Sequence, residues 1–187
     1  MMLMKRRDFL KVGAAASAMA SLYGCAGTGK AGGHVVVVGG GYGGATIAKY
    51  LRMWSEGGVQ VTLIERNPTF ISCPISNLVI GGQKTMEDIT VSYDGLKNTW
   101  GVRVIQGEVA AVNAEKKTIA LKSGDNISYD RLVLSPGVDF MWGEIPALEN
   151  ADAQSKILHA WKAGPQTVAL RQQLESMKDG GVYAISI

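Results

Sequence analysis

Cysteine is scarce in this 187-residue chain, which contains only Cys25 and Cys73. Cys25 lies in or beside an N-terminal leader, so the remainder of the chain has a single thiol and forms no internal disulfide. The sequence has no Cys-x-x-Cys-His segment and no cluster of metal-ligating residues, which excludes an attached haem and predicts no metal site. If the chain is exported, the unpaired thiol requires an explanation, because exported proteins usually pair their cysteines.

Proline and net charge are also low. The chain has five prolines and no low-complexity tract, which argues against disorder, and its 47% of hydrophobic residues is enough to bury one core. The 24 glycines are therefore expected at turns and close backbone approaches. The formal net charge of +3 arises in the leader, where Lys5, Arg6, Arg7 and Lys11 outweigh Asp8. The rest of the chain carries no net charge, and nothing in it suggests a nucleic-acid surface.

Residues 1–25 have the layout of an export signal. Lys5-Arg6-Arg7-Asp8-Phe9-Leu10-Lys11 is similar to the twin-arginine motif, with Lys5 in place of the usual serine or threonine. Val12–Gly24 is an apolar stretch that is too short to span a bilayer. We therefore expect export to the periplasm by the twin-arginine pathway, which carries folded proteins. An ordinary secretory leader, or an amphipathic helix with chance arginines, is the alternative.

The processing of this leader is open. Leu22-Tyr23-Gly24-Cys25 resembles a lipobox, in which Cys25 would be acylated and would attach the protein to a membrane. Tyr23 fits that motif poorly, so cleavage nearby without lipidation is the alternative. Residues 26–33 are expected to form a flexible linker.

A glycine-rich turn follows the first expected strand. His34–Val38 is a β-branched run without polar alternation, as in a strand buried on both faces. After the turn come a helical stretch over 45–54 and a second strand over 59–64 that leads into Glu65. This Gly-x-Gly-x-x-Gly arrangement predicts that a dinucleotide's diphosphate binds at the helix start and that Glu65 accepts hydrogen bonds from its ribose. The alternative is a glycine-rich turn without a ligand. The predicted contacts are Gly39, Gly41, Tyr42, Gly43, Gly44, Glu65 and Arg66.

The order of the following elements favours FAD over NAD. Short strands are expected over 102–113, 117–121 and 127–129, joined by turn residues. A three-stranded meander at this point resembles flavoproteins with two dinucleotide-binding domains, and residues 129–137 resemble their second FAD motif, with Ser135-Pro136 in place of the commoner alanine-threonine. The resemblance implies an α/β fold: a Rossmann-type FAD-binding domain with a parallel sheet and an inserted meander. It adds cofactor contacts at Val109, Pro136 and Gly137.

Cys73 lies in the segment Phe70-Ile71-Ser72-Cys73-Pro74-Ile75-Ser76-Asn77-Leu78-Val79-Ile80-Gly81-Gly82. This segment resembles the flavoprotein subunits of flavocytochrome c sulfide dehydrogenases, which have aromatic-x-x-Cys-x-x-Ser-Asn-x-x-Ile-Gly-Gly. The resemblance implies that Cys73 is bonded to the 8α-methyl group of FAD through a thioether, with Pro74 in place of a bulkier residue. The alternatives are a buried, non-covalent contact with the flavin and a small buried hydrophobe without a flavin role.

The resemblance covers residues 34–187. His159–Thr167, with Pro165 opening a helix, is similar to the segment between the two domains of the family, so His159 and Trp161 are expected to pack at a domain junction. Residues 34–150 are expected to form the FAD-binding domain. Residues 151–187 are expected to form a connecting helix and the first strand, over 182–187, of a second domain that is truncated here.

Family members oxidise sulfide with a redox-active cysteine pair, which is expected beyond Ile187, and pass electrons through FAD to a c-type cytochrome subunit. The resemblance implies this activity for a longer parent, while the 187-residue chain is expected to bind FAD weakly and not to oxidise sulfide. The alternatives are a sulfide:quinone reductase, a nicotinamide-dependent flavin reductase, and a flavin-binding domain without activity.

Overall fold

The computed structural model describes residues 32–184. The predicted leader, Cys25, residues 26–31 of the predicted linker and residues 185–187 lie outside the described residues. Within the described part, no helix is both long enough and apolar enough to cross a bilayer.

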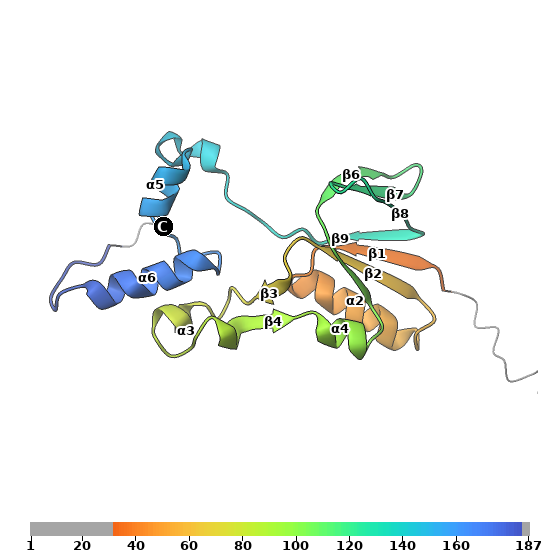
Figure 1. Ribbon diagram of the computed structural model, residues 1–187, viewed down its shortest axis with the longest axis horizontal. Helices are drawn as coiled ribbons and strands as arrows, with labels where there is room; N and C mark the ends of the chain where they lie inside the picture. The colour runs from red at the N-terminus through yellow and green to blue at the C-terminus, as the bar shows by residue number, and fades with distance from the viewer. Residues whose placement is uncertain (1–31, 185–187) are drawn as a thin grey trace, which may run out of the picture. The chain divides into compact units, whose positions relative to one another are not determined.

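Four parallel strands form the central sheet of the described residues, in the order β5-β2-β1-β9 (Figure 1). Val36 of β1 lies opposite Thr62 of β2 and Leu132 of β9. The parallel sheet predicted from the sequence is confirmed. The bounds of its strands are β1 His34–Val38, β2 Gln60–Glu65, β5 Arg103–Gln106 and β9 Arg131–Leu134.

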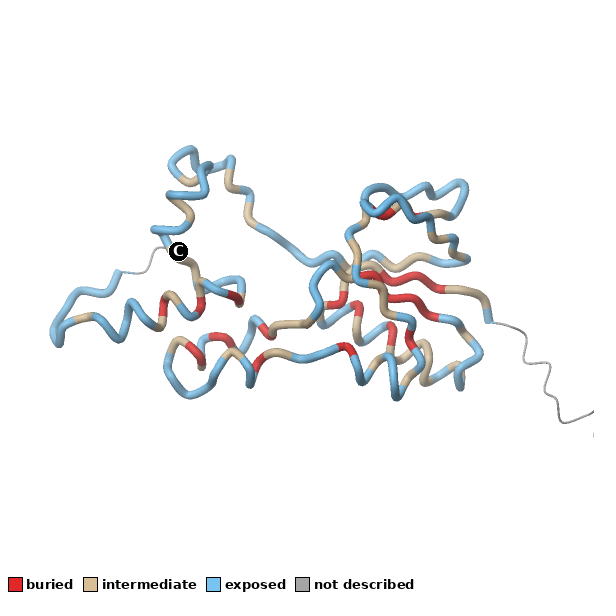
Figure 2. Tube along the Cα trace, in the orientation of Figure 1, coloured by how far each residue is buried: buried red, intermediate tan, exposed pale blue. Residues whose placement is uncertain are grey.

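Both faces of this sheet are covered, which explains why β1 has no polar alternation. On one face Val37 packs with helix α2 (Tyr42–Trp54). On the other face Val36 packs against Ile119 of β7 (Thr118–Leu121). Val36, Val37 and Ile119 are each 0% exposed, and the buried positions follow the strands in Figure 2.

The three-stranded meander is confirmed, but its first strand is shorter than the expected strand over 102–113. The antiparallel meander consists of β6 (Val109–Asn113), β7 and β8 (Asn126–Ser128). The expected strand breaks at Gly107, because the Gly107 N–H bonds to the Glu65 carbonyl at 2.9 Å, whereas the next residue accepts a hydrogen bond from Lys122 N–H. The chain thus leaves the parallel sheet after β5 and enters the meander at β6.

Cys73 lies in a second segment that leaves the parallel sheet, residues 69–92, called here the β3 excursion. Strand β3 (Thr69–Ile71) pairs antiparallel with β4 (Thr90–Ser92), and Cys73 lies on the connection between them. The same connection contains helix α3 and a short 3-10 helix, and α4 then leads to β5. The bounds of these elements are α3 Asn77–Ile80, η1 Glu87–Ile89 and α4 Asp94–Asn98.

After β9 the chain forms short helical turns and then helix α6 (Pro165–Ser176), which Pro165 opens as predicted. The Arg171 guanidinium of α6 donates to the Ile80 carbonyl at the end of α3, at 3.2 Å. Residues 182–184, the described part of the expected last strand, have no strand structure. The remaining bounds are η2 Trp142–Glu144, η3 Pro146–Leu148 and α5 Ala151–Lys156.

The turn between β1 and α2 requires glycine for two different reasons. Gly39 has φ +96°, a conformation that residues with a side chain rarely adopt. A side chain at Gly44 would overlap the carbonyl oxygen of Gly39, so the start of the helix lies directly against the end of the strand. Helix α2 therefore begins at Tyr42, ahead of the expected start at Ala45.

The middle of the turn is held on both sides by hydrogen bonds. The Gly40 N–H donates to the Glu65 carboxylate at 2.7 Å, and the Gly40 carbonyl accepts from the buried Tyr93 hydroxyl at 3.1 Å. Burial, and then the charge of Glu65, raise the pKa of Tyr93 to about 12. Tyr93 therefore remains a neutral hydrogen-bond donor well above the ordinary tyrosine pKa of about 10.

Tyr93→Phe should remove the last tyrosine to ionise in an alkaline absorbance titration. Because the folded pKa lies above the unfolded one, the contribution of Tyr93 to stability is complete below about pH 10 and is lost as the pH rises toward its folded pKa. The substitution should also lower the free energy of unfolding at neutral pH by about 1 kcal/mol, since the Gly40 carbonyl loses its donor. The exposed Tyr183 provides the control Tyr183→Phe. A high-pH titration unaltered by Tyr93→Phe would contradict this assignment.

Candidate dinucleotide-binding site

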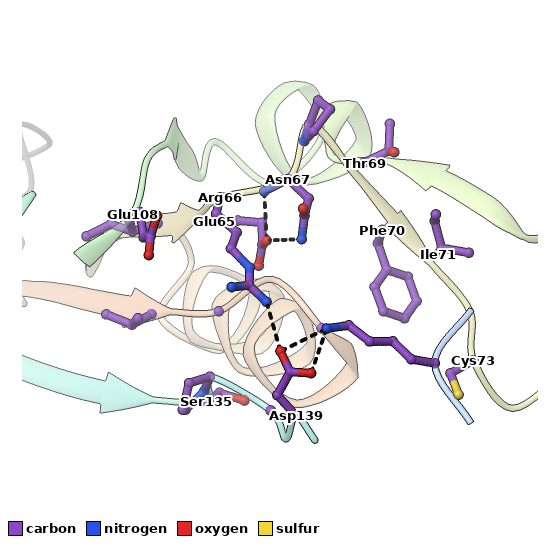
Figure 3. A pocket seen from close by; sticks show the side chains of 18 of the residues that line it. Glu65, Arg66, Asn67, Thr69, Phe70, Ile71, Cys73, Glu108, Ser135 and Asp139 are labelled. Atoms are coloured by element: carbon purple, nitrogen blue, oxygen red, sulfur yellow. Dashed lines mark hydrogen bonds and ion pairs between the residues drawn. The ribbon is translucent and has the colours of Figure 1, made fainter. Parts of the chain in front are cut away.

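A cavity of about 820 Å³ opens where β1, β2 and β9 end, beside the glycine-rich turn (Figure 3). Its volume falls in the range of small-molecule sites in proteins. In open parallel sheets, ligands bind outside the carboxyl ends of the strands, and this cavity has that position. The cavity is also lined by the β3 excursion and by the segment before α6.

The structure brings most of the predicted site residues together at this cavity. Those that line it are Gly39, Gly41, Glu65, Arg66, Cys73, Val109, Pro136 and Gly137. Tyr42, Gly43 and Gly44 do not line it. Tyr42 instead contacts the edge of the β3 excursion, where its hydroxyl bonds to Ser72 Oγ at 2.5 Å and its ring meets Phe70 edge-on at 4.9 Å. These three residues form the first turn of α2, so what they offer to a ligand is the backbone N–H groups of the helix start.

Gly41 distinguishes a ligand site from a turn that is merely rich in glycine. A side-chain carbon built on Gly41 meets nothing within 4 Å, whereas one on Gly39 or Gly44 would overlap the backbone. The packing of the described residues therefore does not require glycine at position 41. Gly41 also lines the cavity, so the space that its missing side chain leaves is open to a ligand. This arrangement fits the close approach of a diphosphate.

The start of α2 provides backbone donors for such an anion. Within residues 32–184, no side chain caps this helix, and its first turn has no acidic residue. The first N–H groups of an uncapped helix, together with the helix dipole, attract negative charge. The residues present therefore fit a dinucleotide.

Glu65 makes hydrogen bonds within the protein that the sequence did not predict. Its Oε2 accepts the Gly40 N–H at 2.7 Å, and its Oε1 accepts both the backbone and the side-chain N–H of Asn67 at 2.9 Å. Each carboxylate oxygen has two lone pairs, so Oε2 retains one acceptor site for a ribose hydroxyl. Glu65 thus orders the turn and the start of the β3 excursion in addition to its predicted ribose contact.

Asp139 and Lys162 also line the cavity, and sequence reasoning missed both. Lys162 Nζ lies 3.0 and 2.9 Å from the two carboxylate oxygens of Asp139, and Arg66 Nη2 lies 3.9 Å from one of them. The Lys162 ammonium and the Phe140 N–H hold the pKa of Asp139 below its usual value, and Arg66 adds to this effect. No local pattern signals this cluster, because its members are brought together only by the fold.

Glu108 is neutralised in a similar way. It lines the cavity next to Val109, and its carboxylate lies 2.6 Å from the Lys122 ammonium. The hydrogen bond from Lys122 holds the pKa of Glu108 below its usual value. The charge of this carboxylate is therefore balanced from outside the cavity.

Cys73 lies at the other end of the cavity from Glu108 (Figure 3). Its side chain is exposed, and its thiol donates to the Trp161 carbonyl at 2.5 Å. The alternative that Cys73 is merely a small buried hydrophobe is therefore wrong. Gly41, Glu108 and Cys73 thus line one continuous cavity.

His159 and Trp161 belong to an aromatic cluster. Phe140 lies 4.5 Å from the ring of His159 and 5.1 Å from that of Trp161, and Trp142 extends the cluster. Burial, and then the charge of Lys162, lower the pKa of His159. His159 and Trp161 thus pack against aromatic neighbours, while their expected place at a domain junction stays a prediction. Residues 32–184 contain no group of three or more acidic, histidine or cysteine side chains that could hold a metal ion.

Comparisons with known proteins agree with this geometry. The chain is 31% identical to the sulfide-quinone reductase of Aquifex aeolicus (strain VF5) over 127 residues, which are 68% of this chain and 29% of that protein. It is 56% identical to the sulfide dehydrogenase [flavocytochrome c] flavoprotein chain of Chlorobaculum thiosulfatiphilum over 46 residues, 25% of this chain and 94% of that sequence. The crystal structure of the Aquifex aeolicus sulfide:quinone oxidoreductase superposes with a TM-score of 0.65 and 27% identity, covering 76% of this chain and 31% of the other. The chain thus spans about three-tenths of these Aquifex relatives.

Two family models match the chain. Residues 3–23 match the twin-arginine translocation pathway signal sequence, so the chain carries a signal for export by that pathway. Residues 33–176 match the pyridine nucleotide-disulphide oxidoreductases, a match that takes in the whole sheet, the meander and α6. The chain therefore belongs to the pyridine nucleotide-disulphide oxidoreductase family, and this membership implies an FAD-dependent oxidoreductase.

Proposed function

We propose that the chain is the FAD-binding part of a periplasmic enzyme that oxidises sulfide and passes the electrons to a c-type cytochrome. The observation that carries the proposal is that Gly41, which directly precedes the uncapped start of α2, and the exposed thiol of Cys73 line the same cavity. A diphosphate and a reactive flavin ring are the parts of FAD that such groups suit. FAD supplies a site that accepts two electrons and releases them singly.

The residues of this chain have distinct roles in the proposal. The start of α2 binds the diphosphate through its N–H groups, and Glu65 accepts hydrogen bonds from the adenosine ribose. Val109, Pro136 and Gly137 contact the dinucleotide along the cavity wall. Cys73 would hold the flavin through a thioether from Sγ to its 8α-methyl carbon, which would keep the cofactor attached after export. The thiol S–H bond and one methyl C–H bond would break, and the flavin itself would take up the two electrons and become reduced.

Cytochrome c is preferred as the acceptor because of the 56% identity to the flavocytochrome c flavoprotein chain and the export signal. The competing acceptor is a membrane quinone, which the 31% identity to the Aquifex sulfide-quinone reductase favours. Sulfide is the electron donor and FAD is the cofactor with either acceptor. A nicotinamide-dependent flavin reductase is a more distant possibility within the family, and no feature of the cavity favours it.

Gly41→Ala should weaken FAD binding by about tenfold or more and leave the fold intact, because the added methyl group enters the space proposed for the diphosphate. Flavin fluorescence titration measures the Kd, and thermal unfolding measures the fold. Gly44→Ala provides the contrast, because its methyl group overlaps the Gly39 carbonyl and should cost about 1–3 kcal/mol of stability. Normal FAD binding by Gly41→Ala would remove the diphosphate from this turn.

Cys73→Ser should abolish covalent flavin attachment without abolishing FAD binding, because only the thiol forms the thioether. The yellow colour of the wild-type protein should remain in the pellet after acid precipitation, whereas that of the variant should stay in the supernatant. Ser72→Ala, on the adjacent residue, is the control for disturbance of the loop. A wild-type pellet without colour would contradict covalent attachment and leave non-covalent binding of FAD.

Sulfide should reduce a c-type cytochrome faster than a short-chain quinone when the protein isolated from its own cells is assayed with both in parallel. Faster reduction of the quinone would transfer the proposal to a sulfide:quinone reductase. The 187-residue chain has only Cys25 and Cys73, so it contains no cysteine pair to react with sulfide beside the flavin. By itself this chain is expected to bind FAD without oxidising sulfide, and steady turnover by the purified chain would contradict that expectation.

A further inference from the structure

Three charged side chains from distant parts of the chain meet at the cavity. Arg66 follows β2, Asp139 follows β9, and Lys162 precedes α6. Lys162 contacts both carboxylate oxygens of Asp139, at 3.0 and 2.9 Å, and Arg66 approaches one of them at 3.9 Å. Figure 3 shows the Asp139 carboxylate facing the Arg66 guanidinium across the cavity.

Stability of the fold does not account for this cluster. The side chains of Arg66, Asp139 and Lys162 are 57%, 53% and 45% exposed. Ion pairs that are this exposed contribute little to stability because water screens them. The cluster is therefore better explained by what it presents to the cavity.

The charges around the cavity are unevenly matched. Arg66 and Lys162 are its only lining cations among the described residues, and both share the single carboxylate of Asp139. Glu65 is engaged by Gly40 and Asn67, and Glu108 by Lys122, which does not line the cavity. The cluster of Arg66, Asp139 and Lys162 thus carries one more positive charge than negative, and the charge of Arg66 also acts on Glu108.

We propose that Lys162 is a diphosphate-binding residue of the dinucleotide site and that Asp139 competes with the diphosphate for it. This inference rests on the proposed function, because it requires FAD in the cavity. A diphosphate carries more negative charge and more acceptor oxygens than a carboxylate, so it draws Lys162 away from Asp139. Asp139 repels the incoming diphosphate and occupies its cation, so it opposes binding.

The position of Lys162 in the chain couples this exchange to Cys73. The carbonyl of the preceding residue, Trp161, accepts a hydrogen bond from the Cys73 thiol. The following residues, Ala163 to Pro165, line the cavity. The segment 161–165 therefore contacts both the Cys73 thiol, which the proposed function assigns to FAD, and the Asp139 carboxylate at the cavity. Binding of FAD replaces both contacts.

The two halves of the ion pair should have opposite effects on the affinity for FAD, which a purely structural ion pair would not produce. Lys162→Met, which keeps the apolar stem, should weaken FAD binding about tenfold, as expected for loss of a charged hydrogen bond. Asp139→Asn should tighten it about threefold, the size expected for release from an exposed ion pair. Lys162→Arg should retain most of the affinity. Riboflavin, which has no phosphate, should bind all variants alike.

Flavin fluorescence titration of the full chain measures these constants, with Cys73→Ser in every variant so that binding stays reversible. The exposed pair Lys156–Asp152 on α5 lies outside the cavity, so Lys156→Met and Asp152→Asn repeat the same charge changes as controls and should leave the Kd unchanged. Weaker binding by Asp139→Asn, or an unchanged Kd in Lys162→Met, overturns this inference alone. Absence of FAD binding by the wild-type chain overturns the proposed function and this inference with it. If Lys162→Met does not fold, the direction of the Asp139→Asn effect decides.

Discussion

The close contact between the end of β1 and the start of α2 is the constraint on which the site depends. The Gly39 carbonyl lies where a side chain of Gly44 would be, so the helix starts directly against the end of the strand, and no side chain caps its first N–H groups. Gly40 is then held between Glu65 and Tyr93, which join the turn to β2 and to the start of α4. A donor surface for an anion results from sterics and hydrogen bonds that are present without any ligand.

The carboxylates around the cavity are each paired, and this pairing decides what the cavity can accept. Glu65 is hydrogen-bonded to backbone, Glu108 to Lys122 and Asp139 to Lys162. A diphosphate is repelled by free carboxylates at short distance and far less by carboxylates whose charge is balanced. Lys122 balances Glu108 from outside the cavity, whereas in the proposed site Asp139 opposes an anion by holding Lys162.

The proposed enzyme chemistry depends on bringing two distant motifs to one cavity. The β3 excursion carries the exposed thiol of Cys73 to the end opposite Glu108, and the segment before α6 meets that thiol through the Trp161 carbonyl. Attachment of the flavin at this point suits an exported protein, because a lost cofactor is not replaced outside the cytoplasm. The same geometry serves either proposed acceptor, which is why the choice between cytochrome and quinone rests on resemblance.

The local sequence was sufficient to predict the elements that neighbouring residues encode. The β-branched run of β1, the glycines of the turn and the acidic residue ending β2 predicted the buried strand, the turn and the start of the helix, and the short strands and turn residues that follow predicted the meander. Most of the predicted site residues line the cavity, and those at Cys73, Val109, Pro136 and Gly137 came from the family resemblance. The break at Gly107, the support of Gly40 by Tyr93 and the cluster of Arg66, Asp139 and Lys162 were decided only by the tertiary structure. The physical reason is that a turn or a buried strand is encoded by neighbouring residues through backbone sterics and hydrophobicity. A hydrogen bond or an ion pair between distant segments depends on the packing of the whole sheet, and no spacing in the chain records it.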